Sequence, residues 1–269
     1  MIMKSNLELS GNALKVIGVV LMVFDHIHQM FISVAPAWFP MLGRLVLPIF
    51  IFMCAEGFYH TSNRKRYMLR LLVAAVVMNI GNRILANAMR IVPDIPEHGV
   101  ELINSVFTTM LMTTFYLFFI ERLREGLREN KVAKIAGSIA LMAFPVALTA
   151  ALVFLVYASD NSQTRVFVNA FFLIPNLLAM DGGVPFMLLG ISFYYLRQWR
   201  LAQMTVLVLF SALNFFAGVG GGIQWLMVFA VIPLFLYNGR RGGGNKYFFY
   251  IFYPAHIWGL YTLAWLLQR

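Results

Sequence analysis

Charged residues are scarce in this sequence. Asp, Glu, Lys and Arg make up 12% of its 269 residues, whereas hydrophobic residues make up 61%. A soluble globular domain typically carries about 25% charged residues. The shortage excludes an ordinary soluble domain. The composition instead predicts an all-α, polytopic membrane protein whose helices lie in a lipid bilayer.

Acidic residues and cysteine are scarcer still. There are 11 Asp and Glu against 21 Lys and Arg, and the one cysteine is Cys54. A single cysteine excludes an internal disulfide framework, and nothing beside Cys54 in the sequence would stabilise a thiolate. The net charge of +10 does not indicate a nucleic-acid partner, because no soluble domain is left to bind one. Cytoplasmic loops of membrane proteins carry excess Lys and Arg, which explains the charge.

Two further features are missing. The first apolar run has no small-residue cleavage site, so we interpret it as a retained helix rather than a signal peptide. No internal repeat is visible, and the inverted-repeat pattern common in transporters is therefore absent from the sequence.

The apolar segments predict a single transmembrane domain over residues 1–269, a bundle of about nine or ten helices. A spanning helix needs about 20 mostly apolar residues. The segments that meet or approach this length are 14–33, 41–59, 67–88, 103–120, 133–157, 166–180, 184–196, 201–217, 222–237 and 246–267.

The basic loops predict the orientation. His60–Tyr67 and Glu121–Lys134 are rich in Lys and Arg, which places them and the N-terminus in the cytoplasm. Two later loops, 197–200 and 240–246, are also basic, yet strict alternation of ten spans would put them outside. One solution is that 166–181, which contains Pro175 and ends in Asp181, enters and leaves the membrane on one side. The other is that loop charge is not a reliable guide here.

Ionisable residues lie within the first apolar segment. Lys15 and His26 are eleven residues apart, so on a helix they share one face and lie about 16 Å apart along its axis. Ionisable groups at membrane depth are costly and usually mark a functional site. His26 is therefore predicted to be a general base or a nucleophile that accepts an acyl group. The alternative is a structural histidine that donates to a carbonyl of a neighbouring helix.

Three charged side chains need partners from elsewhere in the bundle. Asp25 is displaced by about 100° from His26 around the helix, and we expect it to meet Arg44 from the next segment. Arg44 could otherwise extend to the interface. Glu56 lies about 18 Å from Arg44 along the helix, so these two residues cannot pair. The alternative for Glu56 is an ion pair with the basic loop that follows it.

The last segment carries polar aromatic residues at a regular spacing. Tyr250, Tyr253 and His256 recur every three residues beside Pro254. A Tyr or His at this position can donate a hydrogen bond to a developing oxyanion. The alternative is an aromatic belt at the membrane interface.

Basic residues on the predicted cytoplasmic side form a rim suited to phosphate groups. The loop Gly239–Lys246 is glycine-rich and basic, and such a loop can present backbone amides and cations to phosphates. A flexible cytoplasmic loop would have the same composition. No metal-ligand spacing is present, since His26 and His28 point in different directions from a helix. No metal is therefore expected.

Three stretches resemble the TraX family of membrane proteins, which are associated with N-terminal acetylation of conjugative pilin. They are LKVIGVVLMVFDHIH, GRLVLPIFIFMCAEGFYHTSNRKRYMLRLL and KYFFYIFYPAHIW. TraX proteins in turn resemble membrane acyltransferases of the acyltransferase-3 type, whose first helix carries an Arg, ten residues and then a His. Lys15 and His26 have that spacing, with Lys in place of Arg. The lysine keeps the charge but loses the guanidinium fork.

The resemblance implies an acetyltransferase of the bacterial inner membrane that uses acetyl-CoA from the cytoplasmic side. The partners would be acyl-CoA and an acceptor peptide, glycan or small molecule. We assign catalytic roles to His26, Asp25, His256 and Tyr253. We assign acetyl-CoA binding to Lys15, Arg44, Glu56, Arg64, Arg66, Arg70, Arg240, Arg241 and Lys246. The rival interpretations are a proton-coupled transporter and a non-catalytic assembly factor for a pilus or envelope complex.

Overall fold

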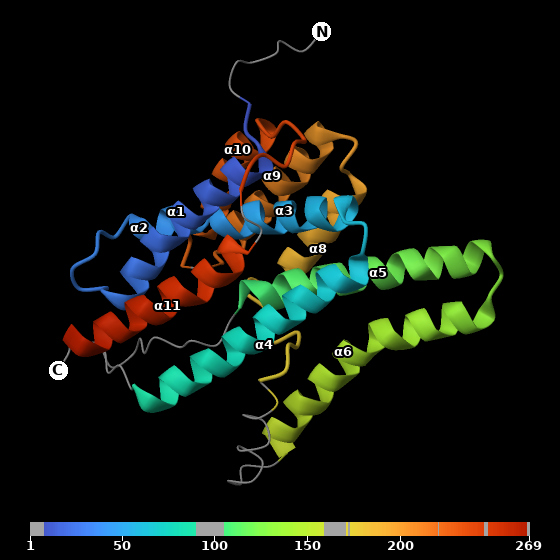
Figure 1. The fold of residues 1–269 in the computed structure, drawn as a ribbon, viewed down its shortest axis with the longest axis horizontal. Coiled ribbons are helices and arrows are strands. Elements are labelled where there is room, and N and C mark those ends of the chain that lie inside the picture. Colours follow the sequence, from blue (N-terminus) through green and yellow to red (C-terminus); the bar gives the residue numbers. More distant parts are fainter. Residues whose placement is uncertain are drawn as a thin grey trace.

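The protein is an all-α bundle in a computed structural model (Figure 1). The structure describes residues 8–89, 105–158, 171, 173–219, 221–244 and 247–267. Its helices are α1 (Gly11–Met30), α2 (Phe39–Gly43), α3 (Val46–His60), α4 (Arg64–Ala88), α5 (Val106–Arg128), α6 (Val132–Ala158), α8 (Gly183–Tyr195), α9 (Arg200–Phe216), the 3-10 helix η1 (Gln224–Ala230), α10 (Val231–Phe235) and α11 (Phe248–Leu267). Within the described ranges, β-pairing is limited to two isolated bridges, Leu9 with Tyr237 and Ser105 with Met180.

Five helical segments are long and apolar enough to cross a membrane. They are Gly11–Met30, Phe39–His60, Arg64–Ala88, Val106–Arg128 and Val132–Leu155. Three shorter apolar stretches, Gly183–Tyr195, Arg200–Phe216 and Gln224–Phe235, accompany them. The prediction of an all-α polytopic membrane bundle is confirmed, while the count of nine or ten spans stays a prediction.

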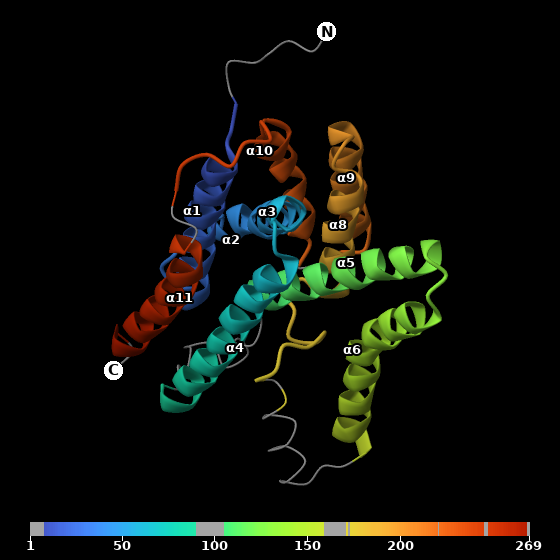
Figure 2. The ribbon, with the colours of Figure 1, turned by 45° about the vertical axis from the view of Figure 1, so that its right-hand side comes forward.

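Helix α3 lies at the centre of the bundle. Figure 2 shows it nearly end-on, between α1, the α8–α9 pair and α5. Most of its side chains are buried, including Phe52 and Phe58, which are fully enclosed. The predicted segment 41–59 is divided at Arg44–Leu45 into α2 and α3. Pro48 therefore falls in the first turn of α3, where its missing N–H would have no helical acceptor anyway.

The start of α1 is bonded to the loop that precedes α11. The backbone N–H of Gly11 donates to the carbonyl of Arg240 (2.8 Å), and that of Asn12 donates to the carbonyl of Arg241 (2.9 Å). Gly242 has a φ of +73°, and a Cβ there would overlap the Ser10 side chain. The glycine-rich loop is thus held against the first helix by backbone hydrogen bonds.

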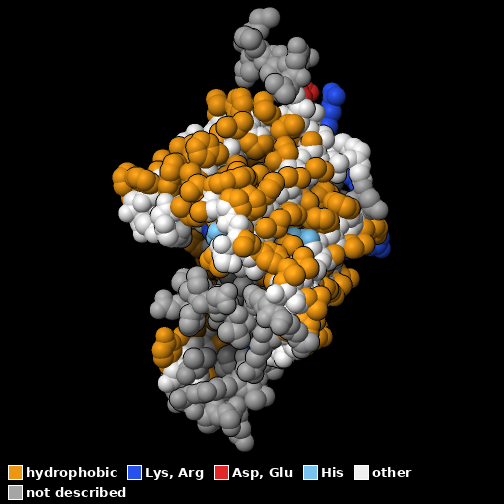
Figure 3. Space-filling model, turned by 90° about the vertical axis from the view of Figure 1, so that its left-hand side faces the viewer, with side chains coloured by type: hydrophobic (Ala, Val, Ile, Leu, Met, Phe, Trp, Pro, Cys, Tyr) orange, Lys and Arg blue, Asp and Glu red, His pale blue; other side chains and the backbone are white. Residues whose placement is uncertain are grey.

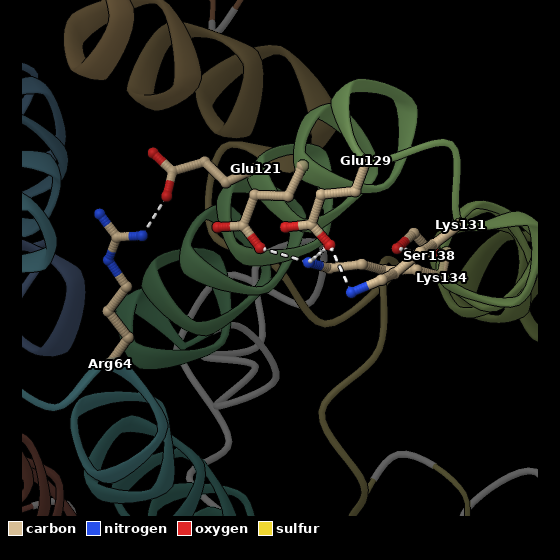
Figure 4. Close-up of polar contacts among 7 residues, drawn as sticks. Arg64, Glu121, Glu129, Lys131, Lys134 and Ser138 are labelled. Atoms are coloured by element: carbon tan, nitrogen blue, oxygen red, sulfur yellow. Dashed lines mark hydrogen bonds and ion pairs between the residues drawn. The ribbon is translucent and has the colours of Figure 1, made fainter.

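Contacts bring the basic loops together at one end of the molecule. Figure 4 shows that Arg64 pairs with Glu121 and that Lys134 on α6 pairs with Glu129 (3.5 Å). Lys134 also pairs with Glu125 (2.8 Å). Arg197, between α8 and α9, lies 3.7 Å from a carboxylate oxygen of Glu56. These contacts place three of the four predicted cytoplasmic loops side by side. The fourth loop, with Arg241, joins them at the start of α1.

The outer surface suits a lipid environment. The face in Figure 3 is dominated by hydrophobic side chains, and Figure 2 shows α6 standing apart from the other helices except α5. On α6, Phe144 and Phe154 are 60% and 70% exposed. An apolar surface of this extent belongs in a membrane or against a partner.

The packing of α4 on α11 leads to a first prediction. A Cβ on Gly81 would overlap the indole ring of Trp258, whose Nε1 donates to Asn82 Oδ1 (3.0 Å). We expect Gly81→Ala to destabilise the protein by about 1–3 kcal/mol through overpacking. Thermal unfolding in detergent measures this against Gly259→Ala on α11, where a Cβ meets nothing within 4 Å. Equal melting temperatures for the two variants would contradict close α4–α11 packing.

Candidate functional site

A polar chamber of about 250 Å³ lies where α1, α3 and α11 meet the segment before α8. Its polar walls come from elements far apart in the sequence. The polar side chains that line it include Asp25, His26, Arg44, Asp181, Gln224 and Tyr253. Three of the four predicted catalytic residues therefore line one cavity, and the fourth, His256, contacts it through His26.

The two histidines are joined by a hydrogen bond. His26 Nδ1 lies 2.9 Å from His256 Nε2, and His256 Nδ1 lies 2.8 Å from the carbonyl oxygen of Phe252. A carbonyl only accepts, so His256 Nδ1 carries the proton and its Nε2 accepts from His26 Nδ1. This assignment leaves Nε2 of neutral His26 as an unprotonated nitrogen. The arrangement is that of a general base oriented by a second group.

Aromatic packing positions His256 and Tyr253 of α11. The ring of Phe252 stacks on His256 with centroids 5.0 Å apart. Phe107 of α5 packs edge-on against Tyr253 at 4.9 Å, and the backbone N–H of Val106 donates to Tyr253 Oη at 3.5 Å. Because Oη accepts this bond, its own proton remains available for a donor role.

Asp25 lies in the chamber without the predicted partner. Its Oδ2 accepts from Gln29 Nε2 (2.9 Å), and Oδ1 is buried with no hydrogen-bond partner among the described residues. Arg44 instead donates to Gln224 Oε1 (3.1 Å) and to the Pro40 carbonyl (3.3 Å). The expected Asp25–Arg44 ion pair is not found in the part of the chain that the structure describes. Both residues line the chamber, where the charge of Arg44 still acts on Asp25.

Asp181 is a chamber residue that the sequence analysis treated only as the end of a segment. It lies in the described stretch 173–182, which contains no helix; residues 166–170 and 172 of the predicted re-entrant segment lie outside the described residues. The hydroxyl of Thr109 donates to the Asp181 carbonyl (2.8 Å). Irregular backbone therefore lines a polar cavity, as expected, while the path of 166–181 through the membrane stays a prediction.

An apolar passage of about 140 Å³ adjoins the chamber. Met22, Val106 and Tyr253 line both cavities and form their junction. Most of the other walls are aromatic or aliphatic, and Cys54 is buried among them.

A third cavity of about 400 Å³, the vestibule, opens at the basic end. Lys15 and Arg70 line both the vestibule and the passage, and Arg241 lines the vestibule alone. Glu56 also faces it, 3.7 Å from both His60 and Arg197. Vestibule, passage and chamber thus form a series from the basic end to His26.

The residues predicted to bind the acyl donor divide into three groups. Lys15, Arg70, Arg241 and Glu56 line the vestibule, whereas Arg44 lies at the far end, in the chamber. The three cavities are not lined by Arg64, Arg66 or Arg240. Arg64 instead donates hydrogen bonds to Glu121 and Tyr194. Lys246 lies outside the described residues. Nothing in the sequence distinguishes the basic residues that line a cavity from those that do not, because loop charges have the same sequence pattern in both cases.

Comparison with known proteins identifies relatives over nearly the whole chain. A family model described as "TraX protein" matches residues 10–264. The "Probable fimbrial assembly protein FimC, serogroup H1" of Dichelobacter nodosus is 28% identical, with 99% of this chain and 100% of that protein aligned. No solved structure matches.

Proposed function

This chain belongs to the TraX family, and from that premise we propose that it is an integral-membrane acetyltransferase. It would move an acetyl group from acetyl-CoA to an amine or hydroxyl acceptor, such as a pilin N-terminus. The observation that carries the proposal is the series of three cavities from a basic vestibule to a histidine pair. The predicted relation to acyltransferase-3 enzymes remains a hypothesis.

The first two cavities suit the two chemical parts of acetyl-CoA. Lys15, Arg70 and Arg241 place three cations around the vestibule, where the phosphates of the nucleotide part would bind by charge-assisted hydrogen bonds. The passage is narrow and mostly apolar, so it suits the pantetheine arm. The thioester would then arrive at the junction formed by Met22 and Tyr253.

The histidine pair suits general-base catalysis of acetyl transfer. Nε2 of His26 would take the proton of the acceptor as its nitrogen or oxygen attacks the thioester carbonyl. The new C–N or C–O bond forms, the C–S bond breaks, and the proton passes to the departing CoA sulfur. Tyr253 Oη would donate to the carbonyl oxygen while it carries negative charge. His256 would hold the His26 ring and stabilise its charged form.

Orientation in the membrane follows from the same proposal. Acetyl-CoA is supplied from the cytoplasm, so the basic end and the N-terminus would face the cytoplasm of a bacterial cell across its inner membrane. The chamber, with Asp25 and Arg44, would then lie toward the outer side.

A non-catalytic assembly factor is the second candidate. The name of the Dichelobacter nodosus relative refers to fimbrial assembly, and a pilus-related membrane protein of either kind fits the family. In an assembly factor the histidine pair would only join α1 to α11. The transporter hypothesis has less support, because the sequence shows no internal repeat.

An acetyl-CoA assay separates these candidates. Purified protein in lipid nanodiscs is incubated with acetyl-CoA labelled in the acetyl group and with an apolar peptide that has a free N-terminus. We expect release of free CoA thiol and transfer of label to the peptide. Neither binding of CoA nor turnover with amine and hydroxyl acceptors would contradict the acetyltransferase and favour the assembly factor.

A further inference from the structure

A further cavity lies at the turn between α5 and α6, and it shares no lining residue with the chamber, the passage or the vestibule. Its volume is about 470 Å³, and its lining residues are Arg122, Lys131, Val132, Ala133 and Lys134. Basic side chains predominate among them, and none of them is acidic. We infer that this cavity binds the headgroup of an anionic phospholipid, whose acyl chains lie along α6. The inference does not depend on the proposed function.

The α5–α6 turn carries more cations than its own carboxylates neutralise. Residues 121–134 contain five Lys and Arg and three Glu, so the turn has a net positive charge. Each of the three glutamates already has a cationic partner, and these partners are Arg64, Lys131 and Lys134. Arg122 is exposed and forms no ion pair within the described part of the chain. The cavity is therefore electrically complementary to an anion.

The two lysines of the cavity are held in place and still have donors for a ligand. Lys131 Nζ lies 3.0 Å from a carboxylate oxygen of Glu129, and Lys134 Nζ lies 3.5 Å from the same oxygen (Figure 4). Lys134 Nζ also lies 2.8 Å from Glu125. An ammonium group has three donors, so each lysine retains at least one for a phosphate oxygen. The ion pairs also restrict the side chains before binding, which lowers the entropy that binding costs.

An apolar stripe on α6 begins at this cavity. Val132 lines the cavity, and Ile139 and Val146 follow it on the same face of the helix, because side chains seven residues apart share a face. The three side chains are 77%, 52% and 53% exposed. They span about 21 Å along the helix axis, which exceeds the roughly 15 Å of hydrocarbon in one leaflet. The stripe is therefore long enough for the acyl chains of a lipid whose headgroup occupies the cavity.

The position of the cavity favours a lipid over a soluble anion. The segment Val132–Leu155 is long and apolar enough to cross a membrane, so its first residues lie where the hydrocarbon meets the headgroup layer. Basic residues at this level attract anionic lipid headgroups. Figure 2 shows α6 standing apart from the other helices except α5, which leaves its exposed stripe accessible to lipid. A soluble anion would occupy the cavity and leave the stripe unused.

Native mass spectrometry of the purified full-length protein tests the inference. The protein is mixed with equimolar phosphatidylglycerol and phosphatidylcholine, which carry the same acyl chains and differ in the charge of the headgroup. We expect the wild type to retain phosphatidylglycerol in at least about fivefold excess, the effect of one Lys or Arg on the binding of an anionic lipid. Equal retention of the two lipids would overturn the inference.

Arg122→Gln and Lys131→Gln should each lower this excess about fivefold. Both side chains are exposed, so the variants should keep the melting temperature of the wild type. Arg128→Gln is the matched control, because Arg128 is exposed on the same turn, carries the same charge and does not line the cavity. It should keep the excess. An equal loss in all three variants would show that only the overall surface charge matters, and it would overturn the site.

The length of the acyl chains tests the stripe separately. Ile139→Asn should lower the retention of dioleoyl phosphatidylglycerol at least about threefold through lost apolar contact. It should not affect the dihexanoyl lipid, whose chains are too short to reach Ile139, about 10.5 Å from Val132 along the axis. Leu141→Asn is the control, because Leu141 is 45% exposed and points to the opposite face of α6. Equal losses in the two variants would overturn the stripe.

Inorganic phosphate distinguishes a lipid site from a site for soluble anions. We expect millimolar phosphate to leave the retention of dioleoyl phosphatidylglycerol unchanged, because the free anion makes no contact with the stripe. Displacement of the lipid by phosphate, with the same dependence on Arg122 and Lys131, would assign the cavity to a soluble anion and overturn the inference. None of these measurements requires turnover, so they give the same answer whether or not the protein transfers acetyl groups.

Discussion

Replacing His26 with alanine is expected to lower acetyl transfer about 10²–10⁴-fold, the usual contribution of a general base. The variant removes the unprotonated Nε2 of a histidine that lines the chamber, and it leaves the vestibule intact, because His26 does not line that cavity. Binding of acetyl-CoA should therefore persist while turnover is lost. The measurement is kcat with labelled acetyl-CoA, together with the Kd of CoA for the same preparation.

His28→Ala is the matched control, because His28 lies on the same helix and lines none of the three cavities. His256 offers a finer comparison. His256→Gln keeps an oxygen that can accept from His26 Nδ1, and His256→Leu does not. We expect the glutamine variant to be at least tenfold more active than the leucine variant and to keep the pH dependence of the wild type. Full activity of His26→Ala would exclude general-base catalysis by this residue.

Removing cations from the vestibule is expected to weaken use of acetyl-CoA. Arg70→Ala and Arg241→Ala should each raise its KM about 10–100-fold, since a charge-assisted hydrogen bond to phosphate contributes about 1.5–3 kcal/mol. The double variant should show roughly the product of the two effects if the arginines act independently. The KM of the wild type should rise with ionic strength for the same reason.

Acetyl-pantetheine provides the internal comparison, because it carries the thioester and lacks the nucleotide phosphates. In the arginine variants, the ratio of kcat/KM for acetyl-CoA to that for acetyl-pantetheine should fall toward one. Lys131→Ala, at the α5–α6 turn and paired with Glu129, should leave the ratio unchanged. If the ratio is the same in every variant, the vestibule does not bind the nucleotide.

The sequence predicted the fold class because helix length and hydropathy are local properties. It also predicted that Lys15 and His26 share a face of one helix. In the structure Lys15 lines the vestibule and passage, and His26 lines the chamber further along α1. Periodicity alone gives this relation, since both residues lie on a single rigid element.

Partners between helices could not be predicted in the same way. His26 bonds to His256, 230 positions later, and this contact depends on how α1 packs against α11. Asp25 was expected to form an ion pair with Arg44, but the Arg44 guanidinium donates a hydrogen bond to Gln224 of η1 instead. Asp181 carried no local signal beyond the glycines that follow it. Such residues become a site only when distant elements pack together.

The long separation of the two histidines has a consequence for biogenesis. During translation α1 enters the membrane long before α11 is made, so the His26 ring has no second imidazole to orient it in the nascent chain. The glycine-rich loop that closes around the first residues of α1 is also synthesised late. In the proposed acetyltransferase, donor binding and proton transfer would therefore both become possible only after α11 has been made. A ribosome-bound intermediate of that enzyme that still lacks α11 would be inert toward acetyl-CoA.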